Sequence, residues 1–330
     1  MKIHSPSNPA RRLVIAAAGA AALAAAHPAR AQAFPSRPLR LIVGFPAGST
    51  TDLMGRELAE GLKQQLGQPV VVENIPGAGS TIAAARAARA AADGYTLYLG
   101  LLGHLLAPFL YEKLPYDTLG DFTPVARISD TRFLIMVNPK VPAADLREFV
   151  AAAKAAPGKF SYGSSGLGAG NHLMMEMFAR RAGIKLLHVP YKSATEALNA
   201  VLAGDIDMTF FNAPPVLAHL RGGTLRTFGV GGAQRSSFAP EVPSLAEAGY
   251  PDFEASTYNF ILAPRGVPQP VVQQLNQAFN TIIASPAFLE RIKPMGATAS
   301  APMTPAQLEQ YLRSEMDAWG PVVKASGARA

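Results

Sequence analysis

The chain has 330 residues, more than one average domain, and its 49% hydrophobic and 16% charged residues can form a large buried core. It has no cysteine, which excludes disulfides, thiolate zinc sites, iron–sulfur clusters and cysteine nucleophiles. The formal charge of +7 includes four basic and no acidic residues before position 34; the remaining 26 basic and 23 acidic residues leave +3, too little to predict nucleic-acid binding.

Residues 1–33 have the pattern of a secretory signal peptide. They combine a basic start, an uncharged run over residues 13–26 and a final Ala31-Gln32-Ala33. The uncharged run is shorter than the roughly 20 residues that span a bilayer, so we expect cleavage near Phe34 and no stable membrane insertion. The pair Arg11-Arg12 leaves open whether export uses the general or the twin-arginine route.

The next part of the chain alternates strands with helices. Residues 39–45 are almost continuously apolar, as expected for a strand buried on both faces. Apolar residues then recur at every fourth position, which predicts one buried helix face: Met54, Leu58, Leu62 and Leu66. A strand, a helix and a strand follow at residues 70–74, 82–92 and 96–101. This alternation predicts right-handed crossovers and a parallel sheet.

A second series of strands and helices begins near residue 127. Its strands are predicted at 133–137, 160–163, 186–189 and 207–211, and its helices at 146–153, 173–182 and 195–203. The C-terminal third is helical, with a capping box at residues 304–307 that starts the last helix. Two such series predict two lobes, and we expect residues 258–264 to return the chain to the first lobe, where the C-terminal helices would pack.

Two loops between a strand and a helix are candidates for ligand binding, at residues 45–52 and 76–81. In an open parallel sheet, loops at the carboxyl ends of the strands form the ligand crevice. Each loop leads into a helix N-terminus, whose free N–H groups favour an anion, and Gly48, Gly77 and Gly79 allow the backbone to approach it. This arrangement suits a carboxylate, although glycine and serine also fill ordinary turns.

Other chemistries lack their motifs. No phosphate-binding GxxxxGK[ST] occurs, and Ile82 occupies the third glycine position of a dinucleotide loop. The segment GSSGLG contains no GxSxG, so Ser164 or Ser165 with His172 is interpreted as loop and helix start rather than a catalytic dyad. The histidines after position 33 have no zinc-binding spacing. We therefore expect no catalytic residue, no metal and no cofactor.

The two loops, FPAGSTTD and GAGST, resemble the signature loops of Bug-type solute-binding receptors, the soluble receptors of tripartite tricarboxylate transporters. The segments PVARI, SYGSSGLGAGNHLMMEMF, HVPYKSATEAL and VPSLAEAGYPDFE extend the resemblance over residues 34–328. It implies a two-lobed α/β fold of the type II periplasmic-binding-protein kind, in which each lobe is a central sheet flanked by helices and the ligand cleft lies between the lobes. The implied boundaries are 34–132 with 256–330 for lobe 1, and 133–255 for lobe 2.

The resemblance also implies ligand-binding residues. In the family both loops hold one ligand carboxylate, largely through backbone groups and ordered water, and the second lobe adds polar groups. The corresponding residues here are Phe45, Pro46, Ala47, Gly48, Ser49, Asp52, Gly77, Ala78, Gly79, Ser80, Ser164, Ser165, Asn171, His172 and Asn212. Ser49 and Ser80 stand where the family commonly has glycine, which puts the ligand's identity in doubt.

The function implied is that of a periplasmic receptor, exported by residues 1–33, that passes a small organic carboxylate to transporter subunits in the membrane. We expect a monomer that binds no nucleic acid. Two alternatives remain: a receptor that reports its ligand to a sensor kinase, and a secreted enzyme on a similar two-lobed fold.

Overall fold

The computed structural model describes residues 34–251 and 253–329. Residues 1–36 and 37–330 form separate units, and in the first of these only residues 34–36 are described, without helix or strand. The predicted signal peptide lies outside the described residues. Within the described residues, no helix is long and apolar enough to cross a membrane.

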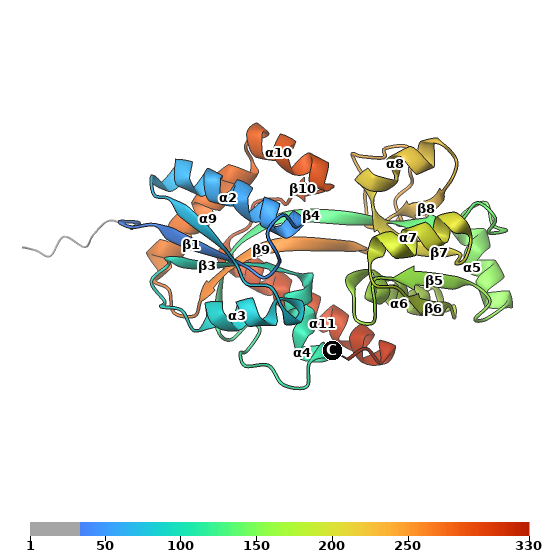
Figure 1. The fold of residues 1–330 in the computed structure, drawn as a ribbon, viewed down its shortest axis with the longest axis horizontal. Coiled ribbons are helices and arrows are strands. Elements are labelled where there is room, and N and C mark those ends of the chain that lie inside the picture. The colour runs from blue at the N-terminus through green and yellow to red at the C-terminus, as the bar shows by residue number, and fades with distance from the viewer. Residues whose placement is uncertain (1–33, 252, 330) are drawn as a thin grey trace, which may run out of the picture. The chain divides into compact units, whose positions relative to one another are not determined.

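The first group of strands is parallel, as predicted. Strand β1 (Leu39–Val43) lies between β2 (Val70–Asn74) and β3 (Thr96–Leu101), with Arg40 opposite Val71 on one side and Thr96 on the other. Helices α2 (Thr50–Leu66) and α3 (Thr81–Ala88) cover opposite faces of this sheet (Figure 1). A short 3-10 turn, η1 (Ala78–Ser80), precedes α3, and α4 (Leu102–Leu110) follows β3.

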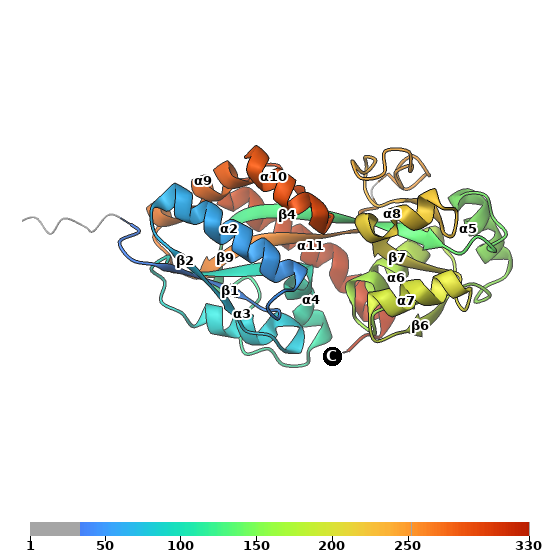
Figure 2. The same ribbon diagram turned by 45° about the horizontal axis from the view of Figure 1, so that its top comes forward.

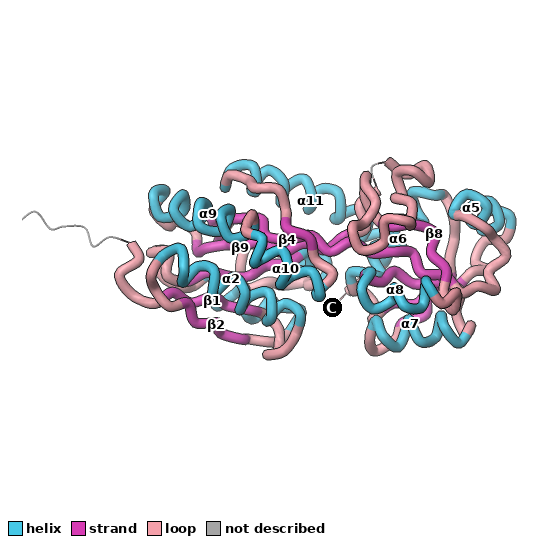
Figure 3. Tube along the Cα trace, turned by 90° about the horizontal axis from the view of Figure 1, so that it is seen from above, coloured by secondary structure: helices cyan, strands magenta, loops and turns pink. Residues whose placement is uncertain are grey.

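Two long strands connect this group with the second. Strand β4 (Phe122–Val137) pairs with β9 (Ser256–Pro264) from Phe122 to Arg132, and its later residues pair with β7 (Met208–Asn212) and β8 (Arg226–Val230). Figure 3 follows β4 from one group of strands into the other. β9 also pairs with β3, in the antiparallel direction, so the chain returns to the first sheet as predicted, but that sheet is mixed rather than entirely parallel. The predicted strand at 133–137 is therefore the end of a longer strand.

The second group has the strand order β4, β7, β5 (Ser161–Ser164) and β6 (Leu187–Pro190), with β5 parallel to both neighbours. Its helices are α5 (Leu146–Ala155), α6 (Gly170–Ala182), α7 (Ala194–Ala203) and α8 (Ala213–Arg221). Helix α6 begins three residues before its predicted start. No capping side chain marks that start, so the sequence pattern alone did not locate it.

The C-terminal elements are helices that pack on the sheets and one short strand that pairs with β4. They are α9 (Gln269–Ile283), α10 (Pro286–Ile292), η2 (Lys293–Met295), β10 (Thr298–Ala299) and α11 (Pro305–Ser326). The predicted capping box is present, since Thr304 and Gln307 cap each other's backbone at the start of α11. Helix α11 packs against α4 of the first group and α6 of the second (Figure 2).

Candidate functional site

The main candidate site is a cavity of about 510 Å³, a size typical of small-molecule sites, lined by residues of both strand groups. Loops and α4 of the first group line one side, and the loop before α6 with its first turns lines the other. The lining residues are Phe45, Gly79, Leu101, Leu102, Gly103, Leu106, Leu110, Tyr111, Phe133, Ser165, Leu167, Gly168, Ala169, Gly170, Asn171, Met174, Ala194 and Thr257. Four of the predicted site residues are therefore at the cavity: Phe45, Gly79, Ser165 and Asn171.

Three helices begin at this cavity without a side-chain cap. In the described part of the chain, α2, α5, α7, α10 and α11 have a capping side chain, and α8 and α9 have proline as their second residue. Helices α3, α4 and α6 have neither. Gly79, residues 101–103 and residues 169–171 line the cavity at their starts. The positive dipole ends of three helices thus lie at one cavity, which favours an anion.

Asn171 adds an unused hydrogen-bond donor to the start of α6. The side chain is 5% exposed, and its Oδ1 accepts hydrogen bonds from Ser165 N (3.2 Å), Ser165 Oγ (3.1 Å) and His172 N (3.1 Å). Its Nδ2 is buried and has no hydrogen-bond partner among the described residues. An unpaired buried donor costs about 1–3 kcal/mol, so a ligand oxygen at Nδ2 would remove that cost.

The second predicted loop has an unusual backbone. Four consecutive residues have positive φ angles: Gly77 (133°), Ala78 (44°), Gly79 (59°) and Ser80 (76°). For Ala78 and Ser80 this conformation costs about 1–2 kcal/mol each, because each carries a Cβ. Gly77 and Ala78 are exposed and, unlike Gly79, do not line the cavity.

Ser80 attaches this loop to the core. Its side chain is buried, and its Oγ lies 2.8 Å from the Tyr98 hydroxyl. Gly44 makes room for it, since a Cβ at Gly44 would lie 1.7 Å from the Ser80 Oγ. Burial raises the pKa of Tyr98 to about 12, so the phenol stays neutral. The hydroxyl at this position therefore faces the core, whereas Gly79 lines the cavity.

Asp52 fixes the backbone of the first predicted loop through hydrogen bonds. Its buried carboxylate accepts hydrogen bonds from Gly48 N (2.8 Å), Arg56 Nε (2.9 Å) and Asn74 Nδ2 (2.9 Å). Asn74 Nδ2 also donates to the carbonyl oxygen of Phe45 (3.0 Å). Burial opposes the charge, but the hydrogen bonds from Arg56, Gly48 and Asn74 together lower the pKa of Asp52.

The remaining residues of the first loop surround this network. Ser49 caps α2, because its Oγ accepts from Asp52 N (3.2 Å). Pro46, Ala47 and Gly48 are exposed. None of these four residues is among those lining the cavity, so Phe45 is the part of this loop that reaches it.

Ser164 and His172 are buried and lie beside His188, and neither lines the cavity. Ser164 Oγ lies 2.7 Å from Nε2 of His188, a pair that its sequence separation did not suggest. His172 stacks on His188 with ring centroids 4.2 Å apart, and its Nδ1 accepts from Gly168 N (3.1 Å). Burial, and then the neighbouring His188, lowers the pKa of His172 to about 4, so it is neutral at pH 7. These side chains support the loop around Gly168.

Asn212 lies apart from the cavity, at the end of β7, where it precedes α8 without capping it.

The cavity residues that the sequence analysis did not predict are mostly apolar. Leu102, Leu106 and Leu110 lie on one face of α4, a helix that was not predicted because Pro108 interrupts an apolar segment without a cap. Their spacing is that of any core helix, so no sequence signal marked them as cavity residues.

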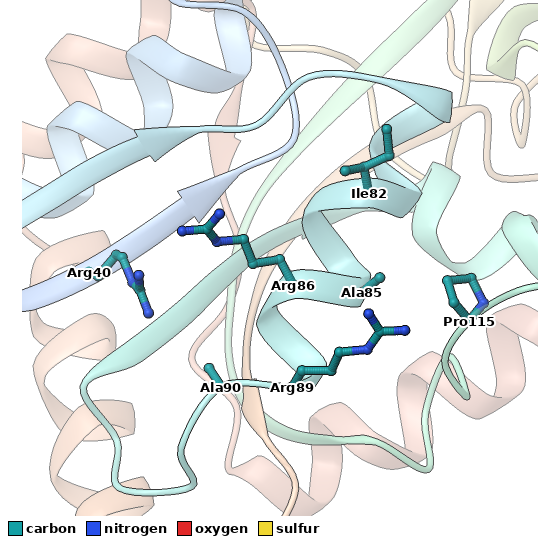
Figure 4. A pocket seen from close by; sticks show the side chains of 7 residues that line it. All are labelled: Arg40, Ile82, Ala85, Arg86, Arg89, Ala90 and Pro115. Atoms are coloured by element: carbon teal, nitrogen blue, oxygen red, sulfur yellow. The ribbon is translucent and has the colours of Figure 1, made fainter.

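A second hollow, of about 660 Å³, lies on the surface over α3 and β1 (Figure 4). Its polar lining is made of the guanidinium groups of Arg40, Arg86 and Arg89. Glu73 pairs with Arg40 (3.4 Å) and Arg86 (3.0 Å) and neutralises part of this charge. The second strand group contributes no lining residue, so this hollow is not a cleft between lobes.

Among the described residues no group of histidine, aspartate and glutamate could hold a metal.

Comparison with known proteins gives a consistent result. Residues 54–328 match the family model described as the tripartite tricarboxylate transporter family receptor. The chain is 38% identical to Protein BugT of Bordetella pertussis over 96% of both chains. It resembles the structure of the periplasmic binding protein BugD (32% identity, TM-score 0.69), which covers 90% of this chain and 99% of that one. It also resembles R. palustris Rpa4515 with adipate (31% identity, TM-score 0.72, 90% and 100% covered).

Proposed function

Because this chain belongs to the tripartite tricarboxylate transporter family of receptors, we propose that it captures a small organic carboxylate in the 510 Å³ cavity and delivers it to a membrane transporter of that type. It is a solute-binding receptor with the two-lobed periplasmic-binding-protein fold, and not an enzyme. In a receptor, the Ser164–His188 pair positions a loop rather than acting as a nucleophile.

The observation that carries this proposal is the convergence of three uncapped helix starts on one cavity. Each start contributes roughly half a positive charge, and α3 and α4 lie on one side of the cavity while α6 lies on the other with the free Nδ2 of Asn171. No lysine, arginine or histidine is among the lining residues of the described chain, so the anion would be held by N–H donors and dipoles.

The proposed lobes are residues 34–132 with 256–330, and residues 133–255. Two features of β4 and β9 support these limits: the two strands pair as far as Arg132 and Ser256, and from Phe133 onward β4 pairs with the second group. The two crossing segments would then form the hinge, and a ligand that contacts both lobes would favour the closed state.

Export to the periplasm and delivery to a transporter are also part of the proposal. Residues 1–33 would direct export, and the family connects its receptors with tripartite membrane transporters. Deletion of the transporter genes should abolish uptake of the ligand while leaving binding by the purified receptor intact. Uptake that continues after this deletion would contradict delivery and would favour a receptor that serves a sensor.

The binding proposal is tested by thermal unfolding and calorimetry with adipate as the probe. A ligand that binds only the native state at 100 times its dissociation constant adds about 2.7 kcal/mol to the free energy of unfolding. We expect such a shift with adipate and none with the neutral isostere adipamide, in the presence or absence of a chelator. Equal shifts with adipate and adipamide would contradict recognition of a carboxylate, and loss of binding with the chelator would contradict a metal-free site.

A further inference from the structure

One wall of the cavity is a row of leucines. Leu102, Leu106 and Leu110 are four residues apart on α4 and therefore share one helix face. Leu167 and Met174 line the cavity from the second strand group. The polar groups are confined to the uncapped helix starts, Tyr111, Thr257, and Ser165 with Asn171. The cavity thus combines polar groups with apolar side chains, and of the latter Leu110 and Leu167 keep accessible surface, whereas Leu102, Leu106 and Met174 are at most 2% exposed.

Leu167 is unusually exposed for a leucine. Its side chain is 64% exposed, so folding gains little from it. Leu167 is one of six exposed large hydrophobic residues in the described chain. Of these six, it is the one that lines this cavity. An apolar side chain left in solvent at a binding cavity can be buried by an apolar part of the ligand.

These accessible apolar side chains disfavour hydroxylated ligands. A hydroxyl group that loses water against Leu110 and Leu167 finds no hydrogen-bond partner in those side chains, and an unpaired polar group costs free energy. A methylene group gains instead: burying one contributes about 0.8 kcal/mol, which corresponds to about fourfold in affinity.

We propose that the ligand of this receptor is a carboxylate whose body is an unhydroxylated chain of several carbon atoms, which lies between Leu110 of α4 and Leu167. Short hydroxylated polycarboxylates should bind more weakly. This inference rests on the proposed carboxylate-binding function of the cavity and adds the chemical class of the ligand.

The test is calorimetry with two pairs of ligands that differ only in hydroxylation of the chain. Adipate is paired with galactarate, and hexanoate with gluconate; the members of each pair have equal numbers of carbons and carboxylates. We expect the unhydroxylated member of at least one pair to bind at least about 10-fold more tightly than its partner. Because the pairs differ from each other by one carboxylate, the result also shows whether the ligand carries one or two.

Two exposed leucines provide matched variants. Leu167→Ser should weaken binding of the tighter ligand about 10-fold and leave its hydroxylated partner unaffected. Leu187, 56% exposed on β6 and not a lining residue of this cavity, is the control, and Leu187→Ser should change neither affinity. Both positions are on the surface, so both variants should fold.

Three results would overturn the inference. If galactarate or gluconate binds as tightly as its unhydroxylated partner, the carboxylate function stands and the apolar-body inference is wrong. If Leu167→Ser has no greater effect than Leu187→Ser, the placement of the body against Leu167 is wrong. If all four carboxylates fail to bind, the proposed function of the cavity is contradicted, and the inferred ligand class is contradicted as well.

Discussion

At the scale of single residues, the site contains polar groups with two different tasks. Asp52 and Ser80 use their side chains to hold loops in place, and Asn171 keeps one donor free. A buried polar group that is fully satisfied stabilises one backbone conformation, whereas an unsatisfied one costs free energy until a ligand pairs with it. Substitution of Asp52 should therefore change the stability of the fold, whereas substitution of Asn171 should change ligand binding.

Asn171→Asp should abolish most carboxylate binding with little effect on folding. The remaining oxygen can still accept the hydrogen bonds from Ser165 and His172, but a negative charge replaces the free donor. We expect the affinity for adipate to fall at least about 10-fold, or 1.4 kcal/mol, in calorimetry at pH 7. Asn212→Asp is the control, because Asn212 does not line the cavity, and an equal loss in that variant would contradict the assignment.

Asp52→Asn should make stability less dependent on acid. The pKa of Asp52 is lowered in the folded protein, so its contribution to stability is fully present above the unfolded-state value of 3.8 and disappears as the pH falls through the folded value. We expect a loss of about 1 kcal/mol at pH 7, from weakened hydrogen bonds to Gly48 and Arg56. Denaturant titrations at pH 7 and pH 3 measure this, and an unchanged difference between wild type and variant would refute it.

At the scale of elements, the loop–helix junctions explain what the sequence could predict. Continuous apolar strands and regular four-residue spacing located most strands and helices of both series, because period and burial are encoded locally. The start of α6 and all of α4 were missed, and neither has a capping side chain that would mark its start in the sequence.

The candidate site was predicted less completely than the fold. Glycine-rich loops pointed to Gly79 and Phe45, and the resemblance pointed to Ser165 and Asn171. The leucine row and Leu167 could not be predicted, because a cavity wall and a core face have the same spacing in sequence. Whether a leucine faces a neighbouring helix or a ligand depends on how distant elements pack.

The two loop glycines should respond differently to alanine. Both Gly48 (82°) and Gly79 (59°) have positive φ, so each alanine variant should lose about 1 kcal/mol of stability. A Cβ at Gly79 would lie 3.1 Å from the Tyr111 hydroxyl in the cavity, whereas a Cβ at Gly48 meets no atom within 4 Å. We expect Gly79→Ala to weaken adipate binding and Gly48→Ala to leave it unchanged, and the opposite pattern would assign the ligand to the first loop.

At the scale of the whole molecule, we expect binding and motion to be linked through the crossing strands. The cavity is lined by both strand groups, and β4 and β9 connect them. A ligand held at α3 and α4 on one side and at α6 on the other contacts both groups together, and this differential contact is what can favour a closed state.

Small-angle scattering should detect this closure. We expect the radius of gyration of the purified receptor to decrease when adipate is added to saturation, and to stay unchanged with adipamide. An Asn171→Asp variant that has lost binding provides the second control. An identical radius at confirmed saturation would show that the ligand binds without closure.

The late position of α11 in the chain has a consequence for how the protein folds during synthesis. Helix α11 packs against both α4 and α6, and β9 completes the sheet beside β3, so neither half of the protein has its full set of neighbours until residues beyond 256 have left the ribosome. Long-range pairing of this kind folds slowly, because the chain must close large loops before contacts stabilise it. We therefore expect the chain to complete its folding only after these last residues have been synthesised.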